Sequence, residues 1–288
     1  MKENKLPTKG LPVIEAADIN QSELHIEADV VVVGSGAGGA IPAYHLAAAG
    51  KKVVVLEAGP YVSSEKFSEM LAVGMGQLYQ DDGGQSNKNQ DITILQGACV
   101  GGSTVVNATV CFRTPKYYLD LWAKEFGLNN LTEESLEPYF KQVEEHLSIT
   151  PRTPMETSAC AQKLALGCEK SGIEWKPARR NTKNCALTGA CLSGCPVDRK
   201  QSMLVTYLPW AVSHGATIYS DTRVMTVTEE NGKASGVHAE VVDPATGKKK
   251  ADMHIKAPMV ILAAGAIQTP MILQRSKVAN SSGQVGKN

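Results

Sequence analysis

Three glycines near the start of the chain have the spacing of a dinucleotide-binding turn. Gly34, Gly36 and Gly39 follow Val30–Val33, a β-branched run typical of a strand buried on both faces. In G-x-G-x-x-G the first glycine permits a tight turn, the second lets the main chain approach a pyrophosphate, and the third lets helix and strand pack closely. The helix that follows presents free N–H groups to phosphate oxygens. The spacing predicts a dinucleotide site.

Glu57 supplies the acidic residue that completes this pattern. It ends a second apolar strand, Val53–Leu56, and lies 18 residues after Gly39. A carboxylate at this place accepts hydrogen bonds from ribose hydroxyls and disfavours a 2′-phosphate, so NADP is an unfavourable ligand. Strand, helix and carboxylate together favour a dinucleotide site over a purely structural glycine turn.

The helix between these two strands is expected to turn Ile41, Leu46 and Ala49 inward and to end at Gly50. Residues 61–96 are predicted to form an irregular, exposed loop.

Two further helices are predicted from their end signals. Thr132 begins a helix that leads to His146, with acidic residues in its first turn, and a second helix runs from Ser158 to Ser171.

The second half of the chain alternates apolar and polar residues around two turns. These turns are Asn231-Gly232 and the stretch from Asp243 to Gly247, which predict a three-stranded antiparallel meander. The meander leads into a further buried strand within MVILAAGAIQTP. Because simple NAD enzymes continue with regular βα units instead, this plan favours FAD over NAD.

Composition excludes several classes of protein. The chain has 288 residues, of which 43% are hydrophobic, and it carries 29 basic and 29 acidic residues, so no net charge favours nucleic acid or acidic lipid. No stretch approaches the roughly 18 apolar residues of a membrane span. The first 28 residues contain no apolar run of signal-peptide type, which makes the cytoplasm the default location.

Four stretches resemble the glucose–methanol–choline (GMC) family of FAD-dependent alcohol oxidoreductases. They are VVVVGSGAGG…VVVLEAG, GACVGGSTVVN at 97–107, TRV at 222–224, and GAIQTPMILQRS. The likeness extends from about Asp29 to the end of the chain. Three positions depart from the family pattern: Ala98 replaces a basic residue, Cys111 an aromatic residue or alanine, and Lys277 a glycine.

The resemblance implies an α/β fold in which a Rossmann-like FAD-binding domain, a parallel sheet plus β-meander, is interleaved with part of a substrate domain. The implied parts are a polar lead-in at 1–27, FAD-binding segments at 28–115 and 213–288, and a substrate or cap region with a cysteine-rich loop at 116–212. Family members are nearly twice as long. We therefore expect a C-terminally truncated chain that is inactive alone, with the catalytic histidine region beyond residue 288. None of the six histidines present is assigned as catalytic.

By the same resemblance, the second glycine stretch lies against the pyrophosphate and the flavin ring, because only small residues let main-chain N–H groups come close to a flat ring. A plain structural turn is the alternative for Gly101-Gly102. The predicted cofactor-binding residues are Gly34, Gly36, Ala37, Gly38, Gly39, Glu57, Ala58, Val100, Gly101, Gly102, Ser103, Asn107, Val224, Ala264 and Gly265.

Three of the seven cysteines, Cys185, Cys191 and Cys195, fall within eleven residues. Their spacing, C-x₅-C-x₃-C-P, is similar to that of the iron–sulfur sugar and polyol dehydrogenases of this family, which implies a [3Fe–4S] cluster on three thiolates. Two alternatives stay open. One is a zinc site, which normally needs a fourth ligand, and the other is a set of thiols that bind no metal.

The resemblance also implies a reaction and its partners. A CH–OH donor, which is a small alcohol or sugar, gives hydride to flavin N5, and the electrons pass to an acceptor. A cluster would favour a dehydrogenase with a small subunit and a cytochrome-type acceptor, and it would allow periplasmic location through an exported partner subunit. The alternatives are a cluster-free long-chain alcohol or sterol oxidase or dehydrogenase, and a catalytically silent FAD-binding fragment.

Overall fold

The computed structural model describes residues 10–287, so the first nine residues of the predicted lead-in lie outside the described residues. The chain divides into two units. One comprises the described residues up to 106 together with 190–197 and 202–287, and the other comprises residues 107–189 and 198–201. This division differs from the implied boundaries at 115 and 212. Residues 190–197, which include two of the three clustered cysteines, belong to the first unit.

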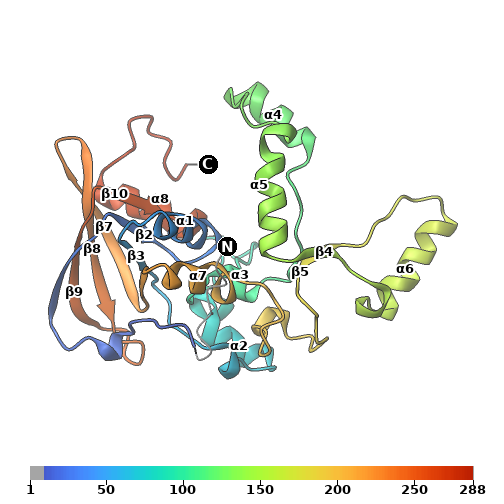
Figure 1. Ribbon diagram of the computed structural model, residues 1–288, viewed down its shortest axis with the longest axis horizontal. Helices are drawn as coiled ribbons and strands as arrows, with labels where there is room; N and C mark the ends of the chain where they lie inside the picture. The colour runs from blue at the N-terminus through green and yellow to red at the C-terminus, as the bar shows by residue number, and fades with distance from the viewer. Residues whose placement is uncertain (1–9, 288) are drawn as a thin grey trace. The chain divides into compact units, whose positions relative to one another are not determined.

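A four-stranded parallel sheet is the centre of the first unit (Figure 1). Its strands are β2 (Val30–Val33), β3 (Val53–Leu56), β6 (Thr217–Tyr219) and β10 (Met259–Leu262), in the order β10-β2-β3-β6. The two valine-rich strands predicted from the sequence are confirmed at both ends. All four strands run parallel, so their carboxyl ends lie along one edge of the sheet.

The predicted antiparallel meander is also confirmed. It consists of β7 (Thr222–Glu230), β8 (Lys233–Val242) and β9 (Lys249–Lys256). Asn231 and Gly232 have φ values of 52° and 76°, the left-handed conformation that the tight turn between β7 and β8 requires. A fourth strand, β1 (Glu23–Glu27), pairs in parallel with β9. Sequence analysis placed β1 in the lead-in and missed it.

The main hydrophobic core lies between these two sheets. Alternate residues of the parallel strands, Val31 and Val33 of β2 and Val54 and Leu56 of β3, pack with the inward face of the meander. Each fully buried side chain of this size contributes about 1.5–3 kcal/mol relative to an exposed one. The meander side of the core is formed by Val224, Val237, Ala239, Val241, Ala251, Met253 and Ile255.

The opposite face of the parallel sheet is covered by α1 (Ala37–Ala48), which contacts β2, β3 and α7. Sequence analysis expected Ile41, Leu46 and Ala49 to face inward, but Ile41 and Leu46 are only half-buried and Ala49 is exposed. The buried residues are small and are Gly39, Ala40, Ala43 and Ala47. Small residues occupy this face because they let the helix axis approach the sheet closely. The helix ends before Gly50 as predicted, with φ of 79° at that glycine.

Residues 61–96 were expected to be irregular, but residues 71–78 form α2 (Leu71–Leu78). Its buried residues are Gly74 and Leu78, and a β-carbon at Gly74 would lie 2.4 Å from Cβ of Ser193. The close packing of α2 on residues 190–197 explains a helix that propensity alone would not predict. The remaining helices of this unit are α3 (Ser103–Val106), α7 (Tyr207–Ser213) and α8 (Gly265–Ser276), with 3₁₀ turns at Ala16–Asp18, Ser64–Lys66, Gln80–Gly83, Cys191–Ser193 and Met203–Val205.

The second unit contains three helices and one short two-stranded ladder. Its elements are α4 (Lys116–Phe126), α5 (Glu133–His146), β4 (Ile149–Pro151), a 3₁₀ turn at Pro154–Glu156, α6 (Ala159–Lys170) and β5 (Arg179–Asn181). The two predicted helices, α5 and α6, are confirmed, and α4 was not predicted. Thr132 caps α5 by accepting a hydrogen bond from the N–H of Ser135.

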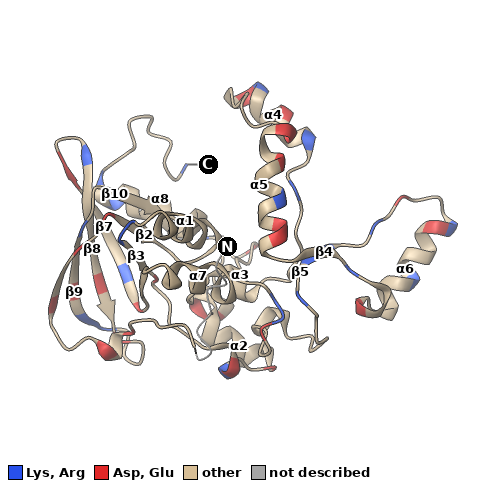
Figure 2. Cartoon of the chain, in the orientation of Figure 1, with Lys and Arg blue, Asp and Glu red and all other residues tan. Residues whose placement is uncertain are grey.

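Both signs of charge occur on α5, as Figure 2 shows, and the acidic residues include two in its first turn. Among the residues that the structure describes, no helix is both long enough and apolar enough to cross a lipid bilayer.

Candidate functional site

Two of the three glycines in the first turn are required by the fold itself. Gly34 has φ of 95°, and a β-carbon there would lie 2.4 Å from the carbonyl oxygen of Ala263. A β-carbon at Gly39 would lie 1.9 Å from the carbonyl oxygen of Gly34. Neither position tolerates a side chain, because the obstacle in each case is main chain. These glycines bring β2, β10 and α1 together.

Gly36 is different, because nothing in the protein requires a glycine there. Its φ of −68° suits any residue, and the nearest atom to an added β-carbon is Cα of Gly102 at 3.9 Å. Gly36 is also the N-cap of α1, the point at which a helix leaves N–H groups without intrahelical partners. Open space beside such N–H groups is the arrangement that admits a phosphate.

Glu57 lies directly after β3 and is almost completely buried. Its Oε2 accepts hydrogen bonds from the N–H of Ser35 at 2.9 Å and from the Ser35 hydroxyl at 2.6 Å, and its Oε1 accepts one from the N–H of Gly59 at 3.0 Å. Burial raises the pKa of Glu57, and these hydrogen bonds oppose the rise. Because each carboxylate oxygen has two lone pairs, Oε1 retains acceptor capacity for a ribose hydroxyl.

Ser35 is a functional residue that sequence analysis missed. Its hydroxyl donates to Glu57 and accepts a 2.8 Å hydrogen bond from the N–H of Gly101. Ser35 therefore connects the acidic residue to both glycine stretches. The only sequence signal was a small hydroxylated residue at the second position of the G-x-G motif.

The second glycine stretch folds against the first. A β-carbon at Gly102 would lie 2.9 Å from Cα of Gly36, and the hydroxyl of Ser103 accepts a hydrogen bond from the N–H of Gly97 at 3.0 Å. Val100 is buried, and a β-carbon at Gly101 would lie 2.7 Å from Cγ2 of Val105. Gly102 and Ser103 thus line the space beside Gly36, whereas Val100 and Gly101 support the turn from behind.

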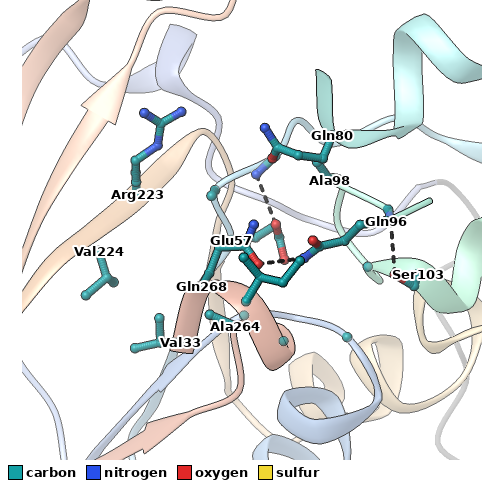
Figure 3. Close-up of a pocket in the computed structure, with 18 of the residues that line it drawn as sticks. Val33, Glu57, Gln80, Gln96, Ala98, Ser103, Arg223, Val224, Ala264 and Gln268 are labelled. Carbon is teal, nitrogen blue, oxygen red and sulfur yellow. Dashed lines mark hydrogen bonds between the residues drawn. The ribbon is translucent and has the colours of Figure 1, made fainter. Parts of the chain in front are cut away.

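These residues surround one large cavity of about 1140 Å³ (Figure 3). It runs along the carboxyl ends of β10, β2 and β3, which are represented in its wall by Ala264, Gly36 and Glu57. A crevice at this edge of a parallel sheet is where open α/β sheets bind ligands. Of the predicted residues, the cavity wall contains Gly34, Gly36, Ala37, Gly38, Glu57, Ala58, Gly102, Ser103, Val224, Ala264 and Gly265.

Four predicted residues do not line the cavity: Val100 and Gly101, described above, and Gly39 and Asn107. Gly39 packs α1 onto β2. Asn107 belongs to the second unit, where its side-chain oxygen accepts a hydrogen bond from the N–H of Thr109 and its carbonyl accepts one from Lys200 Nζ at 2.7 Å. A contact between Asn107 and a flavin ring stays a prediction.

Five glutamines contribute neutral polar groups to the cavity wall. They are Gln77, Gln80, Gln85, Gln96 and Gln268. No histidine occurs in the part of this wall that the structure describes.

The three clustered cysteines are divided between the two units. Cys191 and Cys195 lie in the first unit and Cys185 in the second. Within residues 10–287, no three His, Cys, Asp or Glu side chains form a group that could hold a metal ion. The loop that carries Cys191 is fixed to the first unit, because the Tyr79 hydroxyl donates a 2.6 Å hydrogen bond to the carbonyl of Leu192.

Comparison with protein families gives two matches. The family described as GMC oxidoreductase matches residues 75–288, and the NAD(P)-binding Rossmann-like domain matches residues 32–73. The first match covers most of the chain, including the second glycine stretch and the whole meander.

Individual relatives agree with the family match. The chain is 34% identical to an uncharacterized GMC-type oxidoreductase of Sinorhizobium fredii, with 88% of this chain and 50% of the relative aligned. It is 31% identical to the long-chain-alcohol oxidase FAO3 of Arabidopsis thaliana, with 98% and 38% aligned. The chain thus spans half the length of these relatives or less.

Solved structures share the fold. A structure concerning FAD modification in the formate oxidase of Aspergillus oryzae superimposes with a TM-score of 0.62 at 18% identity, covering 89% of this chain and 48% of that one. Identity at this level supports the fold alone.

Proposed function

Because the chain belongs to the GMC oxidoreductase family, we propose that it forms the FAD-binding portion of an oxidoreductase acting on the CH–OH groups of alcohol, sugar or polyol donors. FAD is the cofactor that membership of this family supports. The observation that carries the proposal is the open space beside Gly36. No contact within the protein requires a glycine at this position, whereas a ligand bound in that space would.

The residues of the cavity fit an extended dinucleotide. Main-chain N–H groups at the start of α1 would bind the pyrophosphate beside Gly36. Gly102, on the facing wall, has no side chain that would fill this space. Glu57 would accept a ribose hydroxyl through Oε1 while Ser35 holds Oε2 in place. The bound FAD supplies a two-electron acceptor for hydride, and the chain's own contribution is to bind and orient it.

Relatives named as long-chain-alcohol oxidases lead us to place long-chain alcohols first among the donors. The test uses the protein as its gene encodes it, loaded with FAD and kept free of oxygen. Addition of a long-chain alcohol should bleach the visible flavin absorbance, and a sugar or a short polyol should do so more slowly. If FAD binds but none of the three donors bleaches it, the proposed activity is wrong and the silent FAD-binding alternative stands.

The electron acceptor depends on the cysteine loop. The three-iron cluster, its small subunit, its cytochrome-type acceptor and a periplasmic location stay predictions, and the C-x₅-C-x₃-C-P spacing is their support. Metal analysis of the purified protein tests them together. Iron that disappears in Cys191→Ser would favour a dehydrogenase, whereas an iron-free protein that is reoxidised by dioxygen would favour the cluster-free oxidase and leave the cytoplasm as the proposed location.

A further inference from the structure

A second buried carboxylate, Asp221, lines the cavity beyond Glu57, and only 4% of this residue is exposed. It follows β6, and its N–H donates a 3.1 Å hydrogen bond to the carbonyl of Gly59. The N–H of the next residue, Thr222, donates to the carbonyl of Glu57 at 2.8 Å. These main-chain contacts fix Asp221 beside the residue proposed to bind ribose.

One oxygen of this carboxylate is used within the protein and the other is not. Oδ2 accepts hydrogen bonds from the N–H of Ala16 at 3.2 Å and from the Ser220 hydroxyl at 3.1 Å. Oδ1 accepts none from any residue that the structure describes, and protein atoms do not enclose it. A reachable, unused acceptor on a buried carboxylate in a cavity wall indicates a hydrogen-bond donor on the ligand.

The charge of Asp221 is also only partly compensated. Burial raises the pKa of Asp221, the hydrogen bonds from Ala16 and Ser220 oppose this rise, and the charge of Asp243 adds to it. A donor on the ligand would therefore stabilise the ionised carboxylate further.

Strand order indicates which part of a dinucleotide meets this oxygen. The order β10-β2-β3-β6 places Gly36 after β2, Glu57 after β3 and Asp221 after β6. Neighbouring strands are about 5 Å apart, which is comparable to the step from a pyrophosphate to its ribose and from the ribose to its base. With the pyrophosphate at Gly36 and the ribose at Glu57, the base extends to Asp221.

The cavity at this end has apolar walls that suit a flat base. The meander contributes Val224, Val242 and Pro244 to them. Apolar side chains contact the faces of a bound ring, and a few polar groups at its edge give specificity. On adenine, the 6-amino group is the hydrogen-bond donor at that edge.

We propose that Asp221 selects the adenine base of the cofactor by accepting a hydrogen bond from the 6-amino group at Oδ1, an inference that rests on the proposed function. Asp221 is thus a specificity-determining residue. Because Ala16 and Ser220 both donate to the Oδ2 position, they also fix the amide of Asp221→Asn. Its oxygen would stay at this position, and its NH₂ group, a donor, would replace Oδ1.

The experiment compares the affinities for ADP and for purine riboside 5′-diphosphate, which is ADP without the 6-amino group. The wild type should bind ADP about tenfold more tightly, the effect of one hydrogen bond to a charged group. In Asp221→Asn this preference should disappear, because a donor would face a donor. Ser220→Ala is the matched control: it removes a donor to Oδ2 but leaves Oδ1 in place, so it should keep the tenfold preference.

The ratio of the two affinities is measured on one protein, so a general loss of stability does not change it. Equal affinity of the wild type for the two diphosphates, or binding of neither, would overturn the inference without any variant. A tenfold preference that survives in Asp221→Asn would overturn it too. A wild-type protein that prefers ADP but does not bind FAD would support the role of Asp221 and contradict the proposed function.

Discussion

The hydroxyl of Ser35 donates a 2.6 Å hydrogen bond to Oε2 of Glu57 and at the same time accepts one of 2.8 Å from the N–H of Gly101. This buried hydroxyl therefore fixes the carboxylate that faces the ribose site and connects it to the second glycine stretch. Ser35 and Gly101 are 66 residues apart in the chain, so one side chain connects the two glycine motifs.

Ser35→Ala should destabilise the protein by about 1–3 kcal/mol, because it leaves the buried N–H of Gly101 without its acceptor. It should also raise the pKa of Glu57 further, since the Ser35 hydrogen bond opposes the effect of burial. Urea denaturation measures the first effect. Ser281→Ala, at an exposed position, serves as the control, and equal stability of the two variants would contradict the role given to Ser35.

Gly39→Ala and Gly38→Ala should behave in opposite ways although the residues are neighbours in α1. A β-carbon at Gly39 would lie 1.9 Å from a main-chain oxygen, whereas one at Gly38 would lie 3.5 Å from Cβ of Ala263, an ordinary contact. Gly39→Ala should cost at least about 3 kcal/mol or prevent folding. Gly38→Ala should be neutral or stabilise by up to about 1 kcal/mol through helix propensity. Thermal unfolding of both variants without ligand measures these changes in stability. A Gly39→Ala protein as stable as the wild type would refute the packing described.

Tyr79→Phe should loosen the loop that carries Cys191. The buried Tyr79 hydroxyl donates to the carbonyl of Leu192, and its loss should cost about 1 kcal/mol. The expected consequence is faster reaction of Cys191 with a thiol reagent, measured by mass spectrometry. Tyr117→Phe, at an exposed tyrosine, should change neither quantity, and a Tyr79→Phe protein with unchanged Cys191 reactivity would show that the bond does not hold the loop.

Glu144 should give the second unit a stability that depends on pH. Hydrogen bonds from Arg113 and Arg179 lower the pKa of Glu144 from 4.5 to about 2. A lowered carboxyl pKa stabilises the folded state above pH 4.5, and this contribution disappears as the pH falls from 4.5 through about 2. Because both arginine side chains are partly exposed, we expect only about 1 kcal/mol.

Thermal unfolding of the wild type and Glu144→Gln across this pH range is the measurement. The melting temperature of the wild type should be higher at pH 6, and the difference should close in acid. A difference that stays constant down to pH 2 would rule out the ion pairs as its cause.

The strongest sequence signals came from local main-chain requirements, and these predicted the structure well. The valine-rich strands β2 and β3 and the turn at Gly34–Gly39 occur where expected. The capped start of α5 at Thr132 does as well. Each depends on neighbours within a few residues, which a single sequence contains.

The missed features depend on distant partners. β1 is a polar-looking segment that becomes a strand by pairing with β9, more than 220 residues later. The inward face of α1 consists of alanines and glycines, because close approach to the sheet outweighs the burial of Ile41 and Leu46. Asp221 comes to lie beside Glu57 only after folding, and its residue type does not suggest a site on its own.

The space beside Gly36 permits the most direct test of the account. Gly36→Ala should fold with the stability of the wild type, because its β-carbon would meet only Cα of Gly102 at 3.9 Å. Its methyl group would enter the space assigned to the pyrophosphate. Titration of FAD into the wild type should therefore give one bound flavin per chain, and Gly36→Ala should bind FAD at least about tenfold more weakly. Equal FAD affinity in the two proteins, or no FAD binding by the wild type, would contradict the cofactor site described.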